Sequence, residues 1–305
     1  MIQEFHPDAV IAFGGGSPID AAKAIVFFAA KTCDMRECMF IAVPTTSGTG
    51  SEVSKFAVIT DPEKEVKYPL VEDSLLPDVA ILDAELTVSV PPSVTADTGI
   101  DVFTHAVEAF VSTEASDFSD AAAEKAIKLV KRHLLPAYQN PEDRKARQGM
   151  HNASCLAGIA FSNSGLGLNH GMAHAIGAKL HIAHGRINAM LLPHIIEFNS
   201  DINKHSKSQA KYLPAVERYK TVARILGLSS YNTIMTVRNL VNWVQFMLKE
   251  MDIPLSVSQM GKISKEEYFA EIERMAEAAP ADGCTATNPR VPSKADVMKI
   301  YESLW

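Results

Sequence analysis

Four of the ten histidines of this 305-residue chain lie within fifteen consecutive residues. His170 and His174 are four residues apart, so on a helix they share one face. Asp101 and His105 repeat that spacing with one carboxylate and one imidazole. A single pair of this kind usually belongs to a solvated helix face. Two pairs on separate helices, followed by His184, have the oxygen and nitrogen donors that suit zinc or ferrous iron. The pattern therefore predicts a metalloenzyme.

A glycine-rich turn follows the first predicted strand. Residues 8–13 form a short apolar run that predicts a buried strand, and residues 14–18 read Gly-Gly-Gly-Ser-Pro. Ser17 is expected to cap a helix over residues 18–31, with Pro18 in its first turn. A strand, a glycine turn and a helix N-terminus direct backbone N–H groups at an anion. A tight strand-to-helix turn with no ligand explains the same residues, so both interpretations stay open.

A second predicted strand, residues 39–43, ends in a loop of mostly hydroxyl and glycine residues, 44–52. Loops that follow neighbouring parallel strands lie at the same sheet edge, where open α/β folds bind ligands. The apolar segment 55–60 follows closely, which disfavours a plain flexible linker. A phosphate-bearing cofactor is the expected ligand of the two loops.

The strand pattern ends at residues 91–92, after further predicted strands at 66–71 and 79–82. Residues 1–92 are predicted to form a partial α/β nucleotide-binding domain, and residues 93–305 an all-helical domain that carries the metal. Helices are predicted at 93–112, 117–138, 142–162, 184–199, 209–226, 231–251, 264–279 and 293–305, with the histidine-rich stretch after 162.

Composition narrows the class of partner. The net charge of −7 and the pI near 5.8 argue against nucleic acid as the main partner. No apolar run approaches the ~20 residues that cross a bilayer, so no membrane association is expected. The four cysteines are dispersed, which predicts reduced thiols, and residues 1–10 lack the pattern of a signal peptide. The expected location is the cytoplasm.

Taken together, the motifs resemble those of iron-containing (group III) alcohol dehydrogenases, over essentially the whole chain. Residues 83–92, 115–118 and 150–154 are most similar to the propanol dehydrogenases of propanediol-degrading bacteria. The motifs that carry the family resemblance are the turn at 14–23, the loop at 44–52, the pair Asp101 and His105, and the series His170, His174 and His184.

The resemblance implies an α/β dinucleotide-binding domain followed by a helical domain, in the dehydroquinate synthase-like architecture. It implies Fe2+, or alternatively Zn2+, between the domains, and NAD(H) or NADP(H) as the second cofactor. The implied metal ligands are Asp101, His105, His170 and His184. The implied cofactor contacts are Gly14, Gly15, Gly16, Ser17, Pro18, Asp20, Thr45, Thr46, Thr49 and Lys67.

The resemblance also implies a reaction. Hydride would pass between the nicotinamide and a short-chain primary alcohol or aldehyde such as propanol or propanal, with the metal as Lewis acid. His174 is expected to relay the alcohol proton, or alternatively to pack beside the metal, whereas His181 is expected to be structural. A homodimer is expected, with the other enzymes of a bacterial microcompartment as further partners.

Some features depart from the family pattern. At least one βαβ unit, ~30 residues, is expected ahead of Ile2, so the chain is predicted to be a fragment of a longer enzyme with an exposed strand edge. Ala183 replaces a proline, and Arg186 with Ile187 replaces a small, apolar pair, which predicts a looser or more polar pocket.

Two other functions are compatible with this architecture. A dehydroquinate synthase-like lyase would need several Lys and Arg side chains near the metal for an acidic phosphate substrate, and the sequence does not show such a set. A non-catalytic remnant would keep the fold and bind no cofactor. The preferred alcohol, the choice of NAD or NADP and the choice of iron or zinc are left open.

Overall fold

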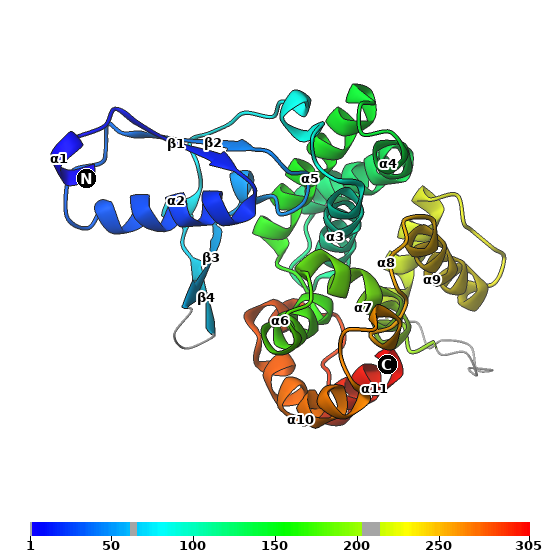
Figure 1. Ribbon diagram of the computed structural model, residues 1–305. Helices are drawn as coiled ribbons and strands as arrows, with labels where there is room; N and C mark the ends of the chain where they lie inside the picture. Colours follow the sequence, from blue (N-terminus) through cyan, green and yellow to red (C-terminus); the bar gives the residue numbers. More distant parts are fainter. Residues whose placement is uncertain (1, 62–65, 203–213) are drawn as a thin grey trace.

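The computed structural model describes residues 2–61, 66–202 and 214–305, and Figure 1 shows a small α/β part beside a larger helical part. The α/β part contains α1 (Ile2–Phe5), β1 (Ala9–Gly14), α2 (Gly16–Ala29), β2 (Met39–Pro44), η1 (Ser51–Val53), β3 (Phe56–Asp61), β4 (Val66–Val71), η2 (Asp73–Leu75), β5 (Val79–Ala80) and η3 (Ala84–Thr87). The helical part contains α3 (Pro92–Val111), α4 (Asp117–Gln139), α5 (Arg144–Ser164), α6 (Leu168–Leu180), α7 (His184–Asn199), α8 (Pro214–Ile225), α9 (Thr233–Glu250), η4 (Ser258–Met260), α10 (Lys265–Ala281), η5 (Gly283–Thr287) and α11 (Lys294–Leu304).

The predicted parallel sheet is confirmed. Its strand order is β1-β2-β5, and Gly14 lies opposite Pro44 at the carboxyl ends of β1 and β2. The predicted strands at 55–60 and 66–71 form a separate antiparallel pair, β3 and β4. The last predicted strand is shorter than expected, because the Asp83 side chain accepts a hydrogen bond from the N–H of Glu85 and starts η3. Only Val79 and Ala80 pair with β2.

Helix α2 covers one face of this sheet. Ile19 packs there against Ala12, Phe40 and Ala42. The other face is open at β1, where Phe13 is 60% exposed. Strand β1 is also an edge strand of the described sheet, which matches the exposed edge expected from the sequence.

The predicted N-cap of α2 is wrong. Gly15 is the N-cap and Ser17 lies inside the first turn, so the helix begins one residue after Gly15 rather than at Pro18. The position at which α2 begins is set by close packing of its first residues against the loop 44–52. A Cβ on Gly16 would lie 3.0 Å from Oγ1 of Thr49, so the chain must turn into the helix already at the glycines.

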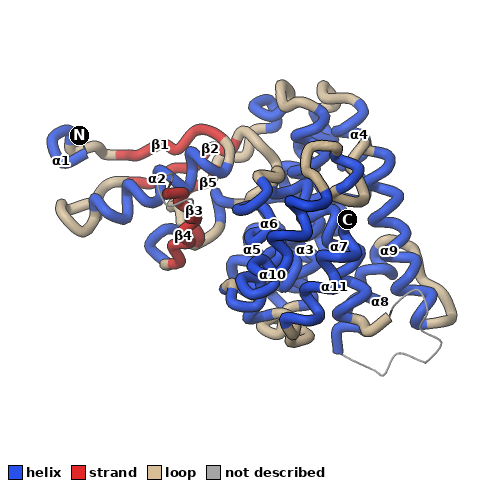
Figure 2. Tube along the Cα trace, turned by 60° about the horizontal axis from the view of Figure 1, so that its bottom comes forward, coloured by secondary structure: helices blue, strands red, loops and turns tan. Residues whose placement is uncertain are grey.

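The strands lie at one end of the molecule, and helices make up the rest (Figure 2). One core forms where α3, α4, α5, α8 and α9 meet, and a second where α6, α7, α10 and α11 meet. Helix α3 is buried along almost its whole length, because other helices pack around it. The predicted helices are confirmed to within a few residues, except that residues 209–213 lie outside the described ranges. Across those ranges no helix has the length and apolar character to cross a bilayer.

Candidate functional site

Three helices bring the four predicted metal ligands together. Helix α3 carries Asp101 and His105 one turn apart, α6 carries His170, and His184 is the first residue of α7. One donor atom from each lies within 4.8 Å of the others. The nearest carboxylate oxygens of Asp101 lie 4.0 Å, 3.7 Å and 3.9 Å from the Nε2 atoms of His105, His170 and His184. Only His184 is substantially exposed, at 37% of its side chain, which leaves one open side.

The contact between α7 and α3 places His184. Gly185 packs directly on the backbone of Asp97, whose carbonyl carbon would lie 2.7 Å from a Cβ on Gly185. A side chain is therefore excluded at this point of the interface. The two helices approach closely enough that His184 reaches the carboxylate of Asp101, one turn further along α3.

The charge state of the buried ligands suits a cation. Burial raises the pKa of Asp101 to about 8, although a hydrogen bond from Asn188 acts in the opposite direction. Burial, reinforced by His170, lowers the pKa of His105 well below its usual value, and burial with His174 does the same to His170. The two imidazoles are therefore neutral and keep the lone pairs that a metal needs. A cation would offset the cost of ionising a buried carboxyl group.

The side-chain amide of Asn188 shows that the site has more acceptors than donors. Its Nδ2 atom lies 2.9 Å from Oδ1 of Asp101, 3.2 Å from Nε2 of His170 and 3.0 Å from Nε2 of His184. An amide NH2 group has two hydrogens, so it satisfies at most two of these three acceptors. A converging set of oxygen and nitrogen lone pairs in surplus is what a divalent transition metal requires. The residues present fit zinc or ferrous iron.

His174 lies beside the cluster rather than in it. Its ring stacks on that of His184 with 5.4 Å between centroids, and its Nδ1 is hydrogen-bonded to Oδ2 of Asp282 at 2.9 Å. Burial alone would raise the pKa of Asp282, but hydrogen bonds from His174 and from the N–H of Cys284 lower it, so Asp282 is a carboxylate.

Cys284 completes a second group of donor atoms with His174 and Asp282. Burial raises the pKa of this thiol well above its usual value, so the sulfur is protonated. The group is thus a hydrogen-bonded one rather than a ready thiolate site. His181 lies away from both groups, at the exposed C-cap of α6 in a left-handed conformation.

The two predicted cofactor loops lie against each other at the sheet edge. The N–H of Thr45 donates to the carbonyl of Gly14 at 2.9 Å. A Cβ on Gly15 would lie 3.3 Å from Oγ1 of Thr46. No side chain caps the first turn of α2, whose N–H groups are the kind that bind a phosphate. Binding of an anion at these loops stays a prediction.

Asp20 joins the loop to the neighbouring hairpin. Its Oδ1 accepts a 2.5 Å hydrogen bond from Oγ of Ser51, and its Oδ2 accepts one from the N–H of Val58 at 3.0 Å. Both oxygens therefore hold protein groups, and direct contact of Asp20 with a cofactor stays a prediction. Lys67 pairs with Thr60 in the hairpin, and its side chain lies outside the described part of the chain.

The second loop also touches the metal-binding helix. A Cβ on Gly48 would lie 2.7 Å from Cβ of Thr98 on α3, one turn before the predicted ligand pair. Oγ of Ser47 is hydrogen-bonded to Nδ1 of His151 on α5, at 3.0 Å. The loop predicted to bind the cofactor therefore packs on the helix that carries Asp101 and His105.

Sequence reasoning missed three polar residues of this site. Glu108 and Asn188 are hydrogen-bonded to the predicted ligands, and Asp282 to His174. A signal was present for two of them: Glu108 lies two turns after Asp101 on one helix face, and Asn188 lies one turn after His184. The expected polar character of Arg186 is present, but its guanidinium is paired with Asp97 at 3.0 Å.

The chain joins a parallel-sheet part, in which no side chain caps the N-terminus of α2, to a helical part with a buried Asp/His cluster. This is the architecture expected of a metal- and nucleotide-binding enzyme. The chain matches the family model "Iron-containing alcohol dehydrogenase" over residues 1–84 and the model "Fe-containing alcohol dehydrogenase family, C-terminal" over residues 95–305. The chain belongs to the iron-containing alcohol dehydrogenase family, whose members are oxidoreductases. The resemblance read from the motifs is thereby confirmed.

Individual relatives agree with this assignment. The chain is 44% identical over 305 residues to 1-propanol dehydrogenase PduQ of Citrobacter freundii, covering 100% of this chain and 80% of that protein. It is 41% identical over 319 residues to the NADPH-dependent butanol dehydrogenase of Clostridium saccharobutylicum, covering 100% and 78%. The structure of a 1,3-propanediol oxidoreductase is similar, with a TM-score of 0.89 and 32% identity, covering 100% of this chain and 78% of the other.

Proposed function

We propose that this protein transfers a hydride between a nicotinamide dinucleotide and a short-chain primary alcohol or aldehyde, such as propanol or propanal, with a divalent metal at the reacting oxygen. The observation that carries the proposal is the cluster of Asp101, His105, His170 and His184, with donor atoms within 4.8 Å of one another. Two of these residues, Asp101 and His105, lie on α3, the helix on which the Ser/Thr-rich loop packs.

In this proposal the four residues of the cluster hold iron or zinc, which would supply a Lewis acid for the substrate oxygen. Asp101, His105 and His170 are buried, so they would hold the metal from inside the protein. His184 borders the open side, where a substrate enters. The protein would contribute to hydride transfer mainly by aligning the alcohol carbon with the nicotinamide.

His174 is the proposed proton acceptor. A carboxylate such as Asp282 accepts hydrogen bonds, so Nδ1 of His174 carries the hydrogen of that pair. The Nε2 atom then keeps a lone pair and can take the hydroxyl proton of an alcohol. Packing beside the metal remains the alternative role of this ring.

The cofactor is proposed to place its phosphates over Gly14–Pro18 at the N-terminus of α2, with Thr45, Thr46 and Thr49 as hydroxyl donors. Two similar proteins are named as dehydrogenases of propanol and butanol, and these names support a short-chain substrate. One of them is named as NADPH-dependent, so both NADH and NADPH are candidates. A homodimer and residence in a bacterial microcompartment stay predictions.

The test measures metal content and reduced-cofactor consumption in the same preparation. The purified chain is expected to bind one equivalent of iron or zinc and to consume NADH or NADPH when propanal is added. Asp101→Asn, which keeps the shape and removes the charge, is expected to lose both metal and activity. Bound metal without any cofactor binding would favour the non-catalytic remnant. Bound metal and cofactor without turnover of propanal would favour a lyase.

A further inference from the structure

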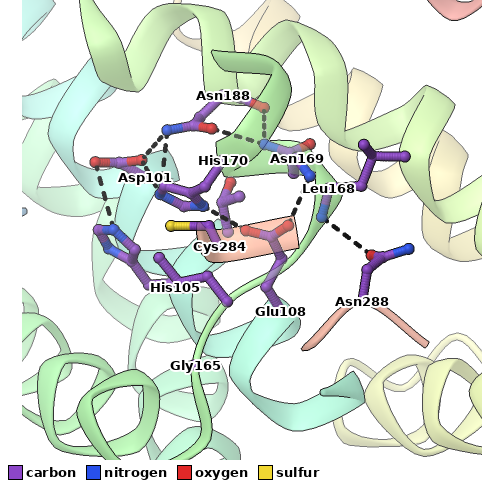
Figure 3. A network of polar contacts seen from close by, with 12 residues as sticks. Asp101, His105, Glu108, Gly165, Leu168, Asn169, His170, Asn188, Cys284 and Asn288 are labelled. Carbon is purple, nitrogen blue, oxygen red and sulfur yellow. Dashed lines mark hydrogen bonds and ion pairs between the residues drawn. The ribbon is translucent and has the colours of Figure 1, made fainter. Parts of the chain in front are cut away.

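Glu108 is a buried carboxylate that contacts two parts of the metal-binding region. It lies on α3, one turn after His105, and is 2% exposed. Its Oε2 is hydrogen-bonded to Nδ1 of His170, and its Oε1 accepts the N–H of Asn169 at 2.7 Å (Figure 3). A carboxyl group is costly to bury with no cationic side chain beside it, so the two hydrogen bonds of Glu108 point to a specific role.

One of these bonds caps α6. The N-cap residue Gly167 has no side chain, and the first N–H groups of the helix are satisfied from elsewhere in the fold. The N–H of Leu168 donates to Oδ1 of Asn288 at 3.1 Å, and that of Asn169 donates to Glu108. A Cβ on Gly167 would lie 2.7 Å from Oε1 of Glu108, so the glycine makes the approach possible.

The other bond selects one tautomer of His170. The Nδ2 group of Asn188 can only donate and lies 3.2 Å from Nε2 of His170, so Nε2 is the acceptor and Nδ1 carries the hydrogen that is donated to Glu108. The lone pair is then on Nε2, and it is Nε2 that faces Asp101 and Asn188. A carboxylate behind an imidazole in this way fixes the ring orientation of a metal ligand and increases its basicity.

We propose that Glu108 is the positioning residue that sets the metal affinity, because it joins α3 to α6 and holds His170 with its Nε2 lone pair toward the metal. This inference rests on the proposed function. The four ligands come from three helices, so their geometry depends on contacts between helices. Among the residues described, Glu108 is the one whose side chain bonds a ligand ring and also caps the helix that carries it.

Glu108→Gln tests the proposal with almost no change in shape. A single amide oxygen cannot replace two carboxylate oxygens that accept from Asn169 and His170. If the amide NH2 turns to His170, Nδ1 becomes the acceptor and the hydrogen moves to Nε2, which removes the metal-binding lone pair. Metal-free full-length protein is titrated with Zn2+ against a chelator of known affinity. The expected loss of affinity is about 10–100-fold.

Two further variants separate tautomer control from helix capping. Asn288→Ala removes the cap at Leu168 and leaves the His170 bond in place, so it is expected to lower the unfolding temperature and keep Zn2+ affinity within about threefold. Glu108→Asp keeps a carboxyl group with two oxygens and is expected to recover part of the affinity lost in Glu108→Gln. Co2+ absorption spectra of the loaded proteins should differ for Glu108→Gln and match wild type for Asn288→Ala.

The outcomes are distinct. Wild-type Zn2+ affinity in Glu108→Gln would overturn the proposal, as would an equal loss of affinity in Asn288→Ala, since capping alone would then explain the effect. A wild-type chain that binds no metal would overturn the proposed function itself, before any variant is compared.

Discussion

The contact between Gly185 and the backbone of Asp97 is predicted to set the position of the proposed metal ligand His184. In Gly185→Ala the new Cβ would lie 2.7 Å from the carbonyl carbon of Asp97. Carbon atoms in favourable contact are about 3.5 Å apart, and the carbonyl oxygen of Asp97 lies closer still, so ~0.8 Å is the least distance by which α7 must move away from α3. His184 is the adjacent residue and moves with it. Metal–ligand distances tolerate only about 0.2 Å, so the displacement exceeds the tolerance about fourfold.

The expected result is a Zn2+ affinity at least about tenfold below wild type, because one of four ligands leaves its position. Overpacking of this kind also destabilises the fold by about 1–3 kcal/mol. Chelator competition measures the affinity, and thermal unfolding of the metal-free protein measures the stability.

Gly177→Ala provides the matched control. Gly177 lies on the ligand-bearing helix α6, and its Cβ would meet only the carbonyl of Ile182, at 3.7 Å. Alanine in a helix interior is favoured over glycine by about 0.5–1 kcal/mol, so this variant should be slightly more stable with unchanged affinity. If Gly185→Ala binds Zn2+ within twofold of wild type, the close approach of α7 does not set the ligand geometry and the reasoning is wrong.

Three further predictions concern other parts of the site. His174→Asn is expected to lower turnover with bound metal retained, measured by steady-state rates and metal analysis on one sample; loss of the metal would refute the proton-acceptor role. Burial raises the pKa of Glu52 from 4.5 to about 7 in the folded protein, so its contribution to stability is full below pH 4.5 and declines as the pH rises through about 7. Glu52→Gln should therefore flatten that decline in thermal unfolding series, and an unchanged pH profile would contradict the assignment. Gly50→Ala should destabilise the fold by about 2 kcal/mol or more, seen in denaturant unfolding, because φ is +61° there and Gly158 Cα would lie 2.7 Å from the new Cβ; an unchanged midpoint would argue against this contact.

The sequence was informative about the site where the chemistry is local to one helix. Asp101 and His105 share a helix face by spacing alone, and so do His170 and His174, which made both pairs predictable. That His184 joins them depends on how α7 packs on α3, a long-range contact that no spacing reveals. The family resemblance supplied this ligand instead, and the structure places it within reach of Asp101.

The errors also have physical reasons. Ser17 is a favourable capping residue, but the start of α2 is set by glycines that pack on Thr49 of a distant loop. Glu108 and Asn188 share helix faces with Asp101 and His184, but spacing alone does not distinguish a ligand from a residue that is hydrogen-bonded to one. Their roles depend on contacts between helices, which the sequence does not show.

The small core of the α/β part has a consequence for how the molecule loses its structure. Four buried apolar residues support the described parallel sheet, whereas two large clusters support the helices. Local opening in proteins begins where few apolar contacts must break. Amide hydrogen exchange is therefore expected to proceed faster in β1 and α2 than in α3, α6 and α7. All four proposed metal ligands lie on the helices in which slower exchange is expected. On gentle heating, the protein should therefore lose nucleotide binding first and keep its metal until these helices unfold.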